Sequence, residues 1–109
     1  RHALASGADP VPMVAALASK LRSMARVAGT RESSAQLAAR LGMKDWQVDR
    51  ARRDLVGWSD DQLGMAIQAA ARADAEVKGA SRDPVFALER LLTVVATRTP
   101  FPGGPAPRR

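Results

Sequence analysis

Few side chains in this 109-residue sequence could perform chemistry. His2 is the single histidine and lies near one end of the chain, where a histidine is usually solvated. The absence of cysteine excludes thiolate nucleophiles, thiolate metal sites and disulfides. No glycine-rich phosphate loop is present, and no two carboxylates are placed to converge in a cleft. We therefore predict no intrinsic catalysis, no cofactor and no metal site.

Asp74 is the one carboxylate that interrupts an apolar pattern. It shares a helical face with four apolar residues, namely Leu63, Ile67, Ala70 and Val77. A carboxylate buried there is costly unless it is paired. We expect a structural ion pair, either with Lys78 one turn later or with an arginine of the preceding helix. An interface or catalytic acid is the alternative.

Basic side chains concentrate in the first half of the chain. The net charge is +6, and residues 20–53 carry nine basic side chains against three acidic ones. Residues 54–96 have a net charge of −3, and residues 97–109 a net charge of +3. This distribution favours nucleic acid or an acidic neighbour as a partner, although a solvated charged helix face explains it equally well.

The spacing of apolar residues predicts an all-α domain of about five helices. Residues 1–6 have the pattern of a helix end, and further helices are expected from about 10 to 28, around 34–41, over 45–56, over 60–78 and from 84 onward. Their boundaries carry start and stop signals: Asp9-Pro10, Ser33 or Ser34, Ser59 with Gln62, and Asp83-Pro84 at the starts; Gly29, Gly42 and Gly79 at the ends. No segment alternates as a strand would.

We expect one domain over residues 1–97 and a disordered tail over 98–109, where Pro, Gly and Arg dominate without periodicity. The first residue is Arg1 rather than Met, so we expect a longer natural polypeptide. No apolar run approaches the roughly 18 residues of a membrane span, and no signal peptide is visible. A cytoplasmic location is expected.

Residues 36–57 have the spacing of a helix-turn-helix unit. Leu37-Ala38, Leu41-Gly42, Val48 and Leu55 fall where such units place core residues and the turn glycine. In this interpretation, the helix over 45–56 contacts DNA through five residues: Lys44, Gln47, Arg50, Arg52 and Arg53.

Three features count against sequence-specific DNA reading. Asp45 and Asp49 would repel phosphates, and Trp46 is bulky for a base-reading helix. The flanking helices are long and apolar, and no wing is evident. Because two short helices packed across a tight turn need the same residues without DNA, DNA binding by residues 36–57 is kept as the alternative function.

Short motifs follow one another in a fixed order along residues 1–97: Gly7 to Pro10 at a turn; Leu17, Leu21 and Arg22; Leu41-Gly42; Trp46 and Val48; Arg50; Trp58-Ser59 with Leu63; Ala73-Asp74; Lys78-Gly79; and Leu88-Glu89 with Leu92. In order and spacing these motifs resemble the C-terminal helical domain of the delta subunit of bacterial DNA polymerase III. The chain departs from that pattern at Arg50, where lysine is usual, and in the tail.

The resemblance implies assembly rather than chemistry. In that family the domain forms a pentameric collar with the corresponding domains of the clamp-loader ATPase (gamma/tau) and delta-prime subunits. The sliding clamp is bound by an N-terminal domain that this sequence does not contain, and DNA is reached only indirectly, through the complex. Charges beside apolar stripes would then set partner choice, and the candidate interface residues are Arg22, Arg26, Arg40 and Arg90.

Overall fold

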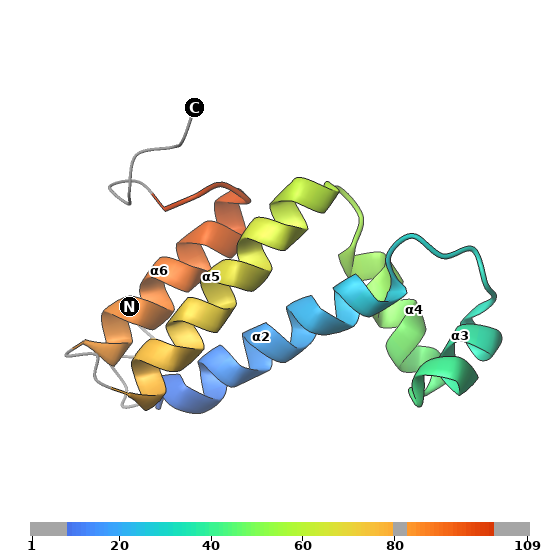
Figure 1. The fold of residues 1–109 in the computed structure, drawn as a ribbon, viewed down its shortest axis with the longest axis horizontal. Helices are drawn as coiled ribbons and strands as arrows, with labels where there is room; N and C mark the ends of the chain where they lie inside the picture. The colour runs from blue at the N-terminus through green and yellow to red at the C-terminus, as the bar shows by residue number, and fades with distance from the viewer. Residues whose placement is uncertain (1–8, 80–82, 102–109) are drawn as a thin grey trace.

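The computed structural model describes residues 9–79 and 83–101 (Figure 1). These residues form α-helices and contain no strand, which confirms the all-α prediction. The helices are α2 (Pro10–Val27), α3 (Ser34–Leu41), α4 (Asp45–Asp54), α5 (Asp60–Lys78) and α6 (Pro84–Thr97). The expected helix end at residues 1–6 and the tail beyond residue 101 lie outside the described residues.

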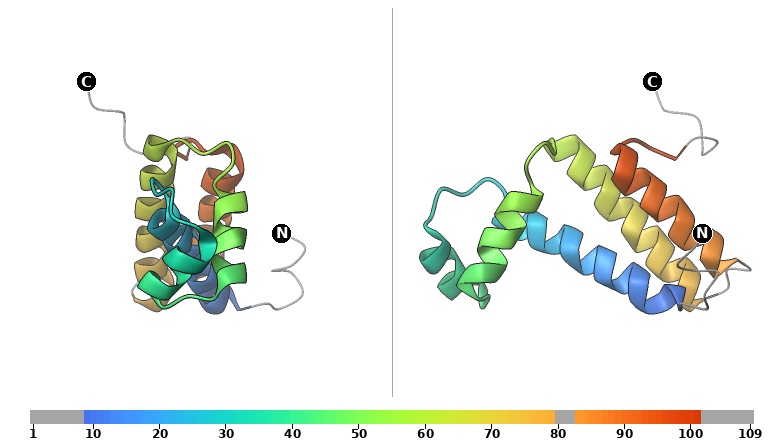
Figure 2. Two further views of the ribbon diagram at one scale, coloured as in Figure 1. Left: turned by 90° about the vertical axis from the view of Figure 1, so that its right-hand side faces the viewer. Right: turned by 180° about the vertical axis from the view of Figure 1, so that it is seen from behind.

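Helix α2 belongs to two lobes. Its N-terminal and central turns pack against the antiparallel pair α5 and α6, and this group is called the long-helix lobe (Figure 1). Its C-terminal end packs with α3 and α4, and this group is called the short-helix lobe. The right-hand view of Figure 2 shows from behind that α3 and α4 project away from the α5–α6 pair. The lobes are joined by α2 itself and by the turn between α4 and α5.

Alanine dominates the core of the long-helix lobe on α5. The buried face of α5 consists of Leu63, Ala66, Ala70 and Ala73. The sequence predicted that Ile67 and Val77 share this face, but both are only partly buried at its edge. Their neighbours Ala66 and Ala73 take the buried positions instead. Small side chains let α2 and α5 approach closely, so the larger residues pack on either side of the contact.

A similar displacement occurs on α6. Ala87, Leu88, Leu91 and Val94 are buried, as expected for Leu88 and Leu91. The spacing of apolar residues in the sequence predicts a stripe of Val85, Leu88, Leu91, Leu92 and Val95 along this helix, but the side chain of Leu92 is 41% exposed. The prediction for Leu92 was therefore wrong, since neighbouring positions on a helix differ by about 100° and only one of them can point at α5.

The short-helix lobe has a small core of its own. Its buried residues are Val27, Leu37, Ala38, Val48 and Ala51, with Leu41 and Met43 packed against them. Leu55, at the end of α4, contacts both this cluster and the core of the long-helix lobe. The core of the short-helix lobe is therefore small, and Leu55 connects it to the core of the long-helix lobe.

The helix boundaries follow local signals in the sequence. Asp9, Ser33, Ser59 and Asp83 cap the helices that follow them, and Ser33 and Ser59 form capping boxes with Gln36 and Gln62. Gly42 ends α3 in the left-handed region, as a C-terminal glycine does. Two ends differ slightly from the prediction: α2 stops at Val27, before Gly29, and α4 stops at Asp54 instead of Val56.

The described chain continues past α6 to Phe101. Arg98 adopts a left-handed conformation with φ 57°, and its guanidinium carbon lies 4.6 Å from the centre of the Trp58 ring. Phe101 meets the ring of Phe86 edge-on, with 5.9 Å between the ring centres. Arg98 and Phe101, which both follow the last helix, therefore contact aromatic side chains of the long-helix lobe.

Candidate functional site

A groove of about 560 Å³ lies between α2 and α4 and is called the α2–α4 groove. Serines and cations of α2 form one wall, polar residues and a tryptophan of α4 form the other, and the turn between α3 and α4 closes one end. The lining residues are Ala16, Ser19, Lys20, Ser23, Arg26, Gly42, Met43, Trp46, Gln47, Arg50, Ala51 and Asp54. The groove is therefore formed within the segment of the chain that carries most of the excess positive charge.

Hydrogen bonds between side chains and the backbone hold the closed end of the groove. Arg26 Nη2 donates a hydrogen bond to the carbonyl oxygen of Leu41 at 2.6 Å, which ties α2 to the end of α3. Gln47 Oε1 accepts a hydrogen bond from the backbone nitrogen of Lys44 at 2.9 Å and so holds the first turn of α4. Gly42 supplies the positive φ of the turn. The turn is therefore rigidly placed before any partner binds.

Trp46 is the largest exposed apolar side chain of the groove, with 56% of its surface accessible. Lys20, Arg26 and Arg50 surround the groove, and Asp54 is its one carboxylate. Lys20 Nζ lies 3.9 Å from Asp54 Oδ1, and Lys20 is exposed, so this ion pair is weak and the groove keeps a positive charge. Such a surface can stack against an apolar or planar group and bind carboxylate or phosphate. Its lining residues include no acid–base pair.

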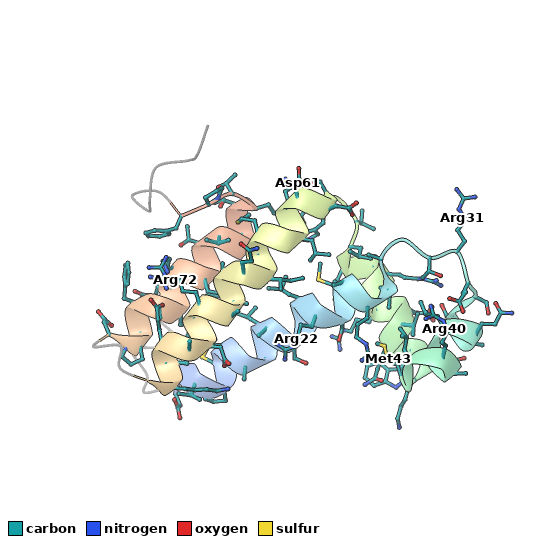
Figure 3. The ribbon with its side chains drawn as sticks, viewed as in Figure 1. Arg22, Arg31, Arg40, Met43, Asp61 and Arg72 are labelled. Atoms are coloured by element: carbon teal, nitrogen blue, oxygen red, sulfur yellow. The ribbon has the colours of Figure 1, made fainter. Side chains whose placement is uncertain are left out.

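Two of the four candidate interface arginines lie on this side of the molecule. Arg22 and Arg26 line a second, smaller hollow of about 420 Å³ beside α5, which shares Ser19, Ser23 and Arg26 with the α2–α4 groove. Figure 3 labels Arg22 on the α2 ribbon and Arg40 on the distant short-helix lobe. The exposed face of α2 is therefore continuous with the groove.

Arg40 forms an ion pair within the short-helix lobe. Its guanidinium donates to the carboxylate of Glu32, with 2.5 Å between Arg40 Nη2 and Glu32 Oε1. This hydrogen bond is the main cause that lowers the pKa of Glu32, although desolvation opposes it and a hydrogen bond from Thr30 adds to it. The same pairing raises the pKa of Arg40. Arg40 is still more than half exposed, so a partner can reach it only beside its carboxylate.

Arg90 occupies the opposite end of the molecule and lies inside the fold. Its side chain is 13% exposed and donates to the carboxylate of Glu76 on α5. Its guanidinium carbon also lies 5.7 Å from the centre of the Phe86 ring. Glu76 is partly buried and pairs with both Arg90 and Arg72. Arg90 is therefore positioned to join α5 to α6, away from the α2–α4 groove.

Asp74 and Lys78 pair with each other along α5. Lys78 Nζ lies 3.0 Å from Asp74 Oδ2. Asp74 is partly buried at the edge of the α5 contact rather than within it, because Ala73 occupies the buried position. Asp74 and Lys78 therefore form an ion pair at the surface, which is a structural role and not a catalytic one.

The residues predicted to contact DNA do not share one surface. Lys44, Arg50 and Arg53 are exposed, but Gln47 is engaged in the cap of α4. Arg52 points into the lobe, where its guanidinium donates to the carbonyl oxygen of Glu32 and to Ser34 Oγ. Asp49 accepts a hydrogen bond from the same serine. A helix whose polar residues hold its own lobe together is poorly arranged for reading bases.

Sequence reasoning missed Lys20 and the use of Trp46 as a groove residue. The spacing of Ser19, Lys20, Ser23 and Arg26 places them on one side of α2, so the sequence did contain a signal for this wall of the groove. What the sequence could not supply is that α4 crosses this side of α2. Among the described residues no group of three or more potential metal ligands lies together. None of the described helices is long and apolar enough to cross a membrane.

Comparison with known proteins gives one match. The family model described as DNA polymerase III delta subunit, C-terminal domain, matches residues 1–95, which include helices α2 to α5, most of α6 and the whole α2–α4 groove. No curated protein and no solved structure compared with the chain matches it significantly.

Proposed function

Because this chain belongs to the family formed by the C-terminal domains of DNA polymerase III delta subunits, we propose that it is a non-catalytic assembly domain of a clamp loader. It binds the corresponding helical domains of the clamp-loader ATPase (gamma/tau) and delta-prime subunits and so fixes the place of its own polypeptide in the ring. It does not bind the sliding clamp, which is the task of an N-terminal domain. The domain works in the cytoplasm, where the bacterial chromosome is replicated.

The observation that carries this proposal is the extent of the family match. The match extends over residues 1–95 and so includes residues of both lobes. The two lobes therefore belong to one family domain. An all-α domain with a concave, partly apolar surface is also well suited to bind another helical domain.

The α2–α4 groove and the adjoining face of α2 are the surface through which we propose that the domain binds a neighbour. Trp46 provides the exposed aromatic anchor that is common at the centre of protein interfaces. Lys20 and Arg26 line the same groove, Arg22 lines the adjoining hollow, and all three can pair with carboxylates of the partner. Arg40 contributes only beside Glu32, and Arg90 does not contribute, because its guanidinium is occupied by Glu76.

Binding to purified C-terminal domains of the ATPase and delta-prime subunits of the same organism tests this proposal. The chain is immobilised, and the wild type is compared with Trp46→Ala and with Val56→Ala, a control at a residue that is 75% exposed and does not line the groove. We expect Trp46→Ala to weaken binding roughly 30-fold or more, as loss of an interface hot spot does, and Val56→Ala to have no effect. Equal affinity of all three proteins would remove the groove from the interface, and no binding at all would contradict the assembly function.

Direct contact with DNA is the second candidate, and the exposed Trp46 between Lys20 and Arg50 favours it. Cations that follow a phosphate backbone, together with an aromatic ring on which a base stacks, are typical of surfaces that bind single strands without sequence preference. The occupied Gln47 and Arg52 argue against the sequence-specific helix-turn-helix form of this function.

Salt dependence separates the two candidates. Binding to a fluorescent oligonucleotide should weaken steeply between low and physiological salt if phosphates are contacted, whereas an interface with a buried aromatic anchor is less sensitive. DNA binding that is lost in Trp46→Ala and Arg50→Ala, with protein binding unchanged, would make DNA the ligand of the groove.

A further inference from the structure

The chain turns back on itself at the end of α6. Arg98, the residue directly after the helix, has φ 57°, a left-handed conformation that residues other than glycine rarely adopt. The hydroxyl oxygens of Thr97 and Thr99 lie 2.8 Å apart across this turn, within hydrogen-bond distance. The guanidinium carbon of Arg98 lies 4.6 Å from the centre of the Trp58 ring and so ties the turn to the start of α5. These contacts direct residues 99–101 back over α6 (Figure 1).

Proline keeps the returning segment extended. Pro100 has a fixed φ and restricts Thr99 to extended backbone, and Pro102, the next proline in the sequence, restricts Phe101 in the same way. Three extended residues cover about 10 Å, which is the rise of about seven helical residues. The side chains of Phe101 and Phe86 close the remaining distance. Their rings meet edge-on, with 5.9 Å between the centres and an angle of 88° between the planes, an arrangement that aromatic pairs favour.

Neighbouring side chains hold Phe86 in place independently of Phe101. The guanidinium carbon of Arg90 lies 5.7 Å from the centre of the Phe86 ring. Arg90 is itself fixed by its ion pair with Glu76 of α5, so the surroundings of the ring are organised before a ligand arrives. Phe86 is still 43% exposed with Phe101 packed against it. The returning segment therefore covers the ring only in part, and a competing ligand can displace it.

We propose that Phe86, with Arg90 beside it, is a docking site on α6 for an aromatic side chain in an extended, proline-flanked segment, and that Thr99–Phe101 fills this site within the chain itself. These three residues are called the strap. A tethered ligand acts at an effective concentration on the order of millimolar, so the strap excludes weak ligands of the same chemistry.

The strap and its site are separate from the proposed assembly surface. The strap lies beyond the residues that the family model matches, which end at residue 95. Neither Phe86 nor Arg90 lines the α2–α4 groove. The proposal therefore does not depend on the function proposed for the domain.

A peptide that competes for Phe86 tests the strap. The probe is a synthetic, end-blocked peptide with the sequence of residues 99–103, and a matched peptide carries Phe101→Ala. Each peptide is titrated into the full 109-residue chain labelled with nitrogen-15, and the amide resonances of α6 are followed by nuclear magnetic resonance. The proteins are the wild type, Phe101→Ala, and Phe101→Ala combined with either Phe86→Leu or Leu92→Ala. Leu92 is the control, because it lies on the same helix and is 41% exposed, nearly as much as Phe86.

Removal of the Phe101 ring should open the site. We expect the peptide to bind Phe101→Ala about tenfold more tightly than the wild type, because the competing aromatic contact is lost. Phe86→Leu keeps an apolar side chain but removes the ring, and should weaken peptide binding about fivefold or more. Leu92→Ala should leave binding unchanged, and the alanine peptide should not bind. The amide spectrum of each variant also reports whether α6 remains folded.

A contact between the two rings in the wild type gives a second readout. The chain has two phenylalanines and no tyrosine, so a nuclear Overhauser effect between two phenylalanine rings can join only Phe86 and Phe101. We expect this effect in the wild type. Its absence overturns the strap, and so does equal binding of the peptide to the wild type and to Phe101→Ala. The docking site is overturned if Phe101→Ala does not bind the peptide, or if Phe86→Leu binds it as tightly as Leu92→Ala does.

Discussion

The guanidinium group of Arg52 lies 2.6 Å from the carbonyl oxygen of Glu32 and donates a hydrogen bond to it, which joins α4 to the loop before α3. A second nitrogen of Arg52 lies 3.2 Å from Ser34 Oγ. The spacing of the sequence places Arg52 among DNA-contacting residues, but the fold uses it to hold the short-helix lobe together.

Replacement of Arg52 should therefore lower stability rather than any affinity for DNA. We expect Arg52→Ala to lower the free energy of unfolding by about 1–2 kcal/mol, because two hydrogen bonds to partly buried acceptors are lost. Arg53→Ala, at the next and exposed position, should change it by less than about 0.5 kcal/mol. Urea unfolding followed by circular dichroism measures both values. Equal effects of the two substitutions would show that the internal hydrogen bonds of Arg52 contribute nothing.

The alanines of α5 should not tolerate larger side chains. Ala66 is fully buried in the core shared by α2, α5 and α6, so Ala66→Leu must displace packed neighbours and should lower the free energy of unfolding by about 1–3 kcal/mol. Ala71→Leu adds the same atoms at an exposed position of the same helix and should cost less than about 0.5 kcal/mol. Thermal unfolding of both variants provides the test. A well-tolerated leucine at position 66 would mean that the core around α5 is less tightly packed than described.

Two ion pairs of α5 should differ in strength. Glu76→Ala leaves the largely buried guanidinium of Arg90 without its carboxylate and should cost about 1–3 kcal/mol. Asp74→Ala removes only a pair with Lys78 one turn away, for which about 0.3–0.5 kcal/mol is expected. A double-mutant cycle with Arg90→Ala checks the first value. A coupling energy near zero between residues 76 and 90 would contradict the structural role assigned to Arg90.

The stability of the short-helix lobe should depend on acid pH through Glu32. Its pKa in the folded protein is lowered, mainly by the hydrogen bond from Arg40, from an ordinary value of 4.5. The unfolded chain therefore binds a proton more readily, and the stabilisation is complete above the ordinary pKa and lost as the pH falls through the lowered one. The difference in unfolding free energy between wild type and Glu32→Gln should be constant above about pH 5.5 and shrink below it. A difference that does not change with pH would place the stabilisation elsewhere.

Local signals in the sequence predicted the helices and their caps well. Asp9, Ser59 and Asp83 begin helices where expected, because an N-cap depends only on residues within one turn. The family prediction is confirmed by the matching family model. The exact buried faces of α5 and α6 were less predictable, because a helical stripe is defined only to within about one residue and alanine at positions 66 and 73 carries little hydrophobic signal.

The roles of the arginines were the least predictable part of the candidate site. An arginine side chain is long enough to reach a partner in another helix or to extend into solvent. Arg90 reaches a carboxylate fourteen residues before it, and Arg52 reaches a carbonyl twenty residues before it. Only the packing of helices decides these pairings. The α2–α4 groove was missed for the same reason, since it arises from the crossing of two helices and not from either one.

The mass of the complex formed with the neighbouring subunits tests the assembly function most directly. The chain is mixed with the C-terminal domains of the clamp-loader ATPase and delta-prime subunits of the same organism, and the mixture is analysed by size-exclusion chromatography with light scattering. The account predicts a stable hetero-oligomer that contains one copy of this chain and persists at physiological salt. A chain that elutes alone at concentrations well above those of a cell would contradict it.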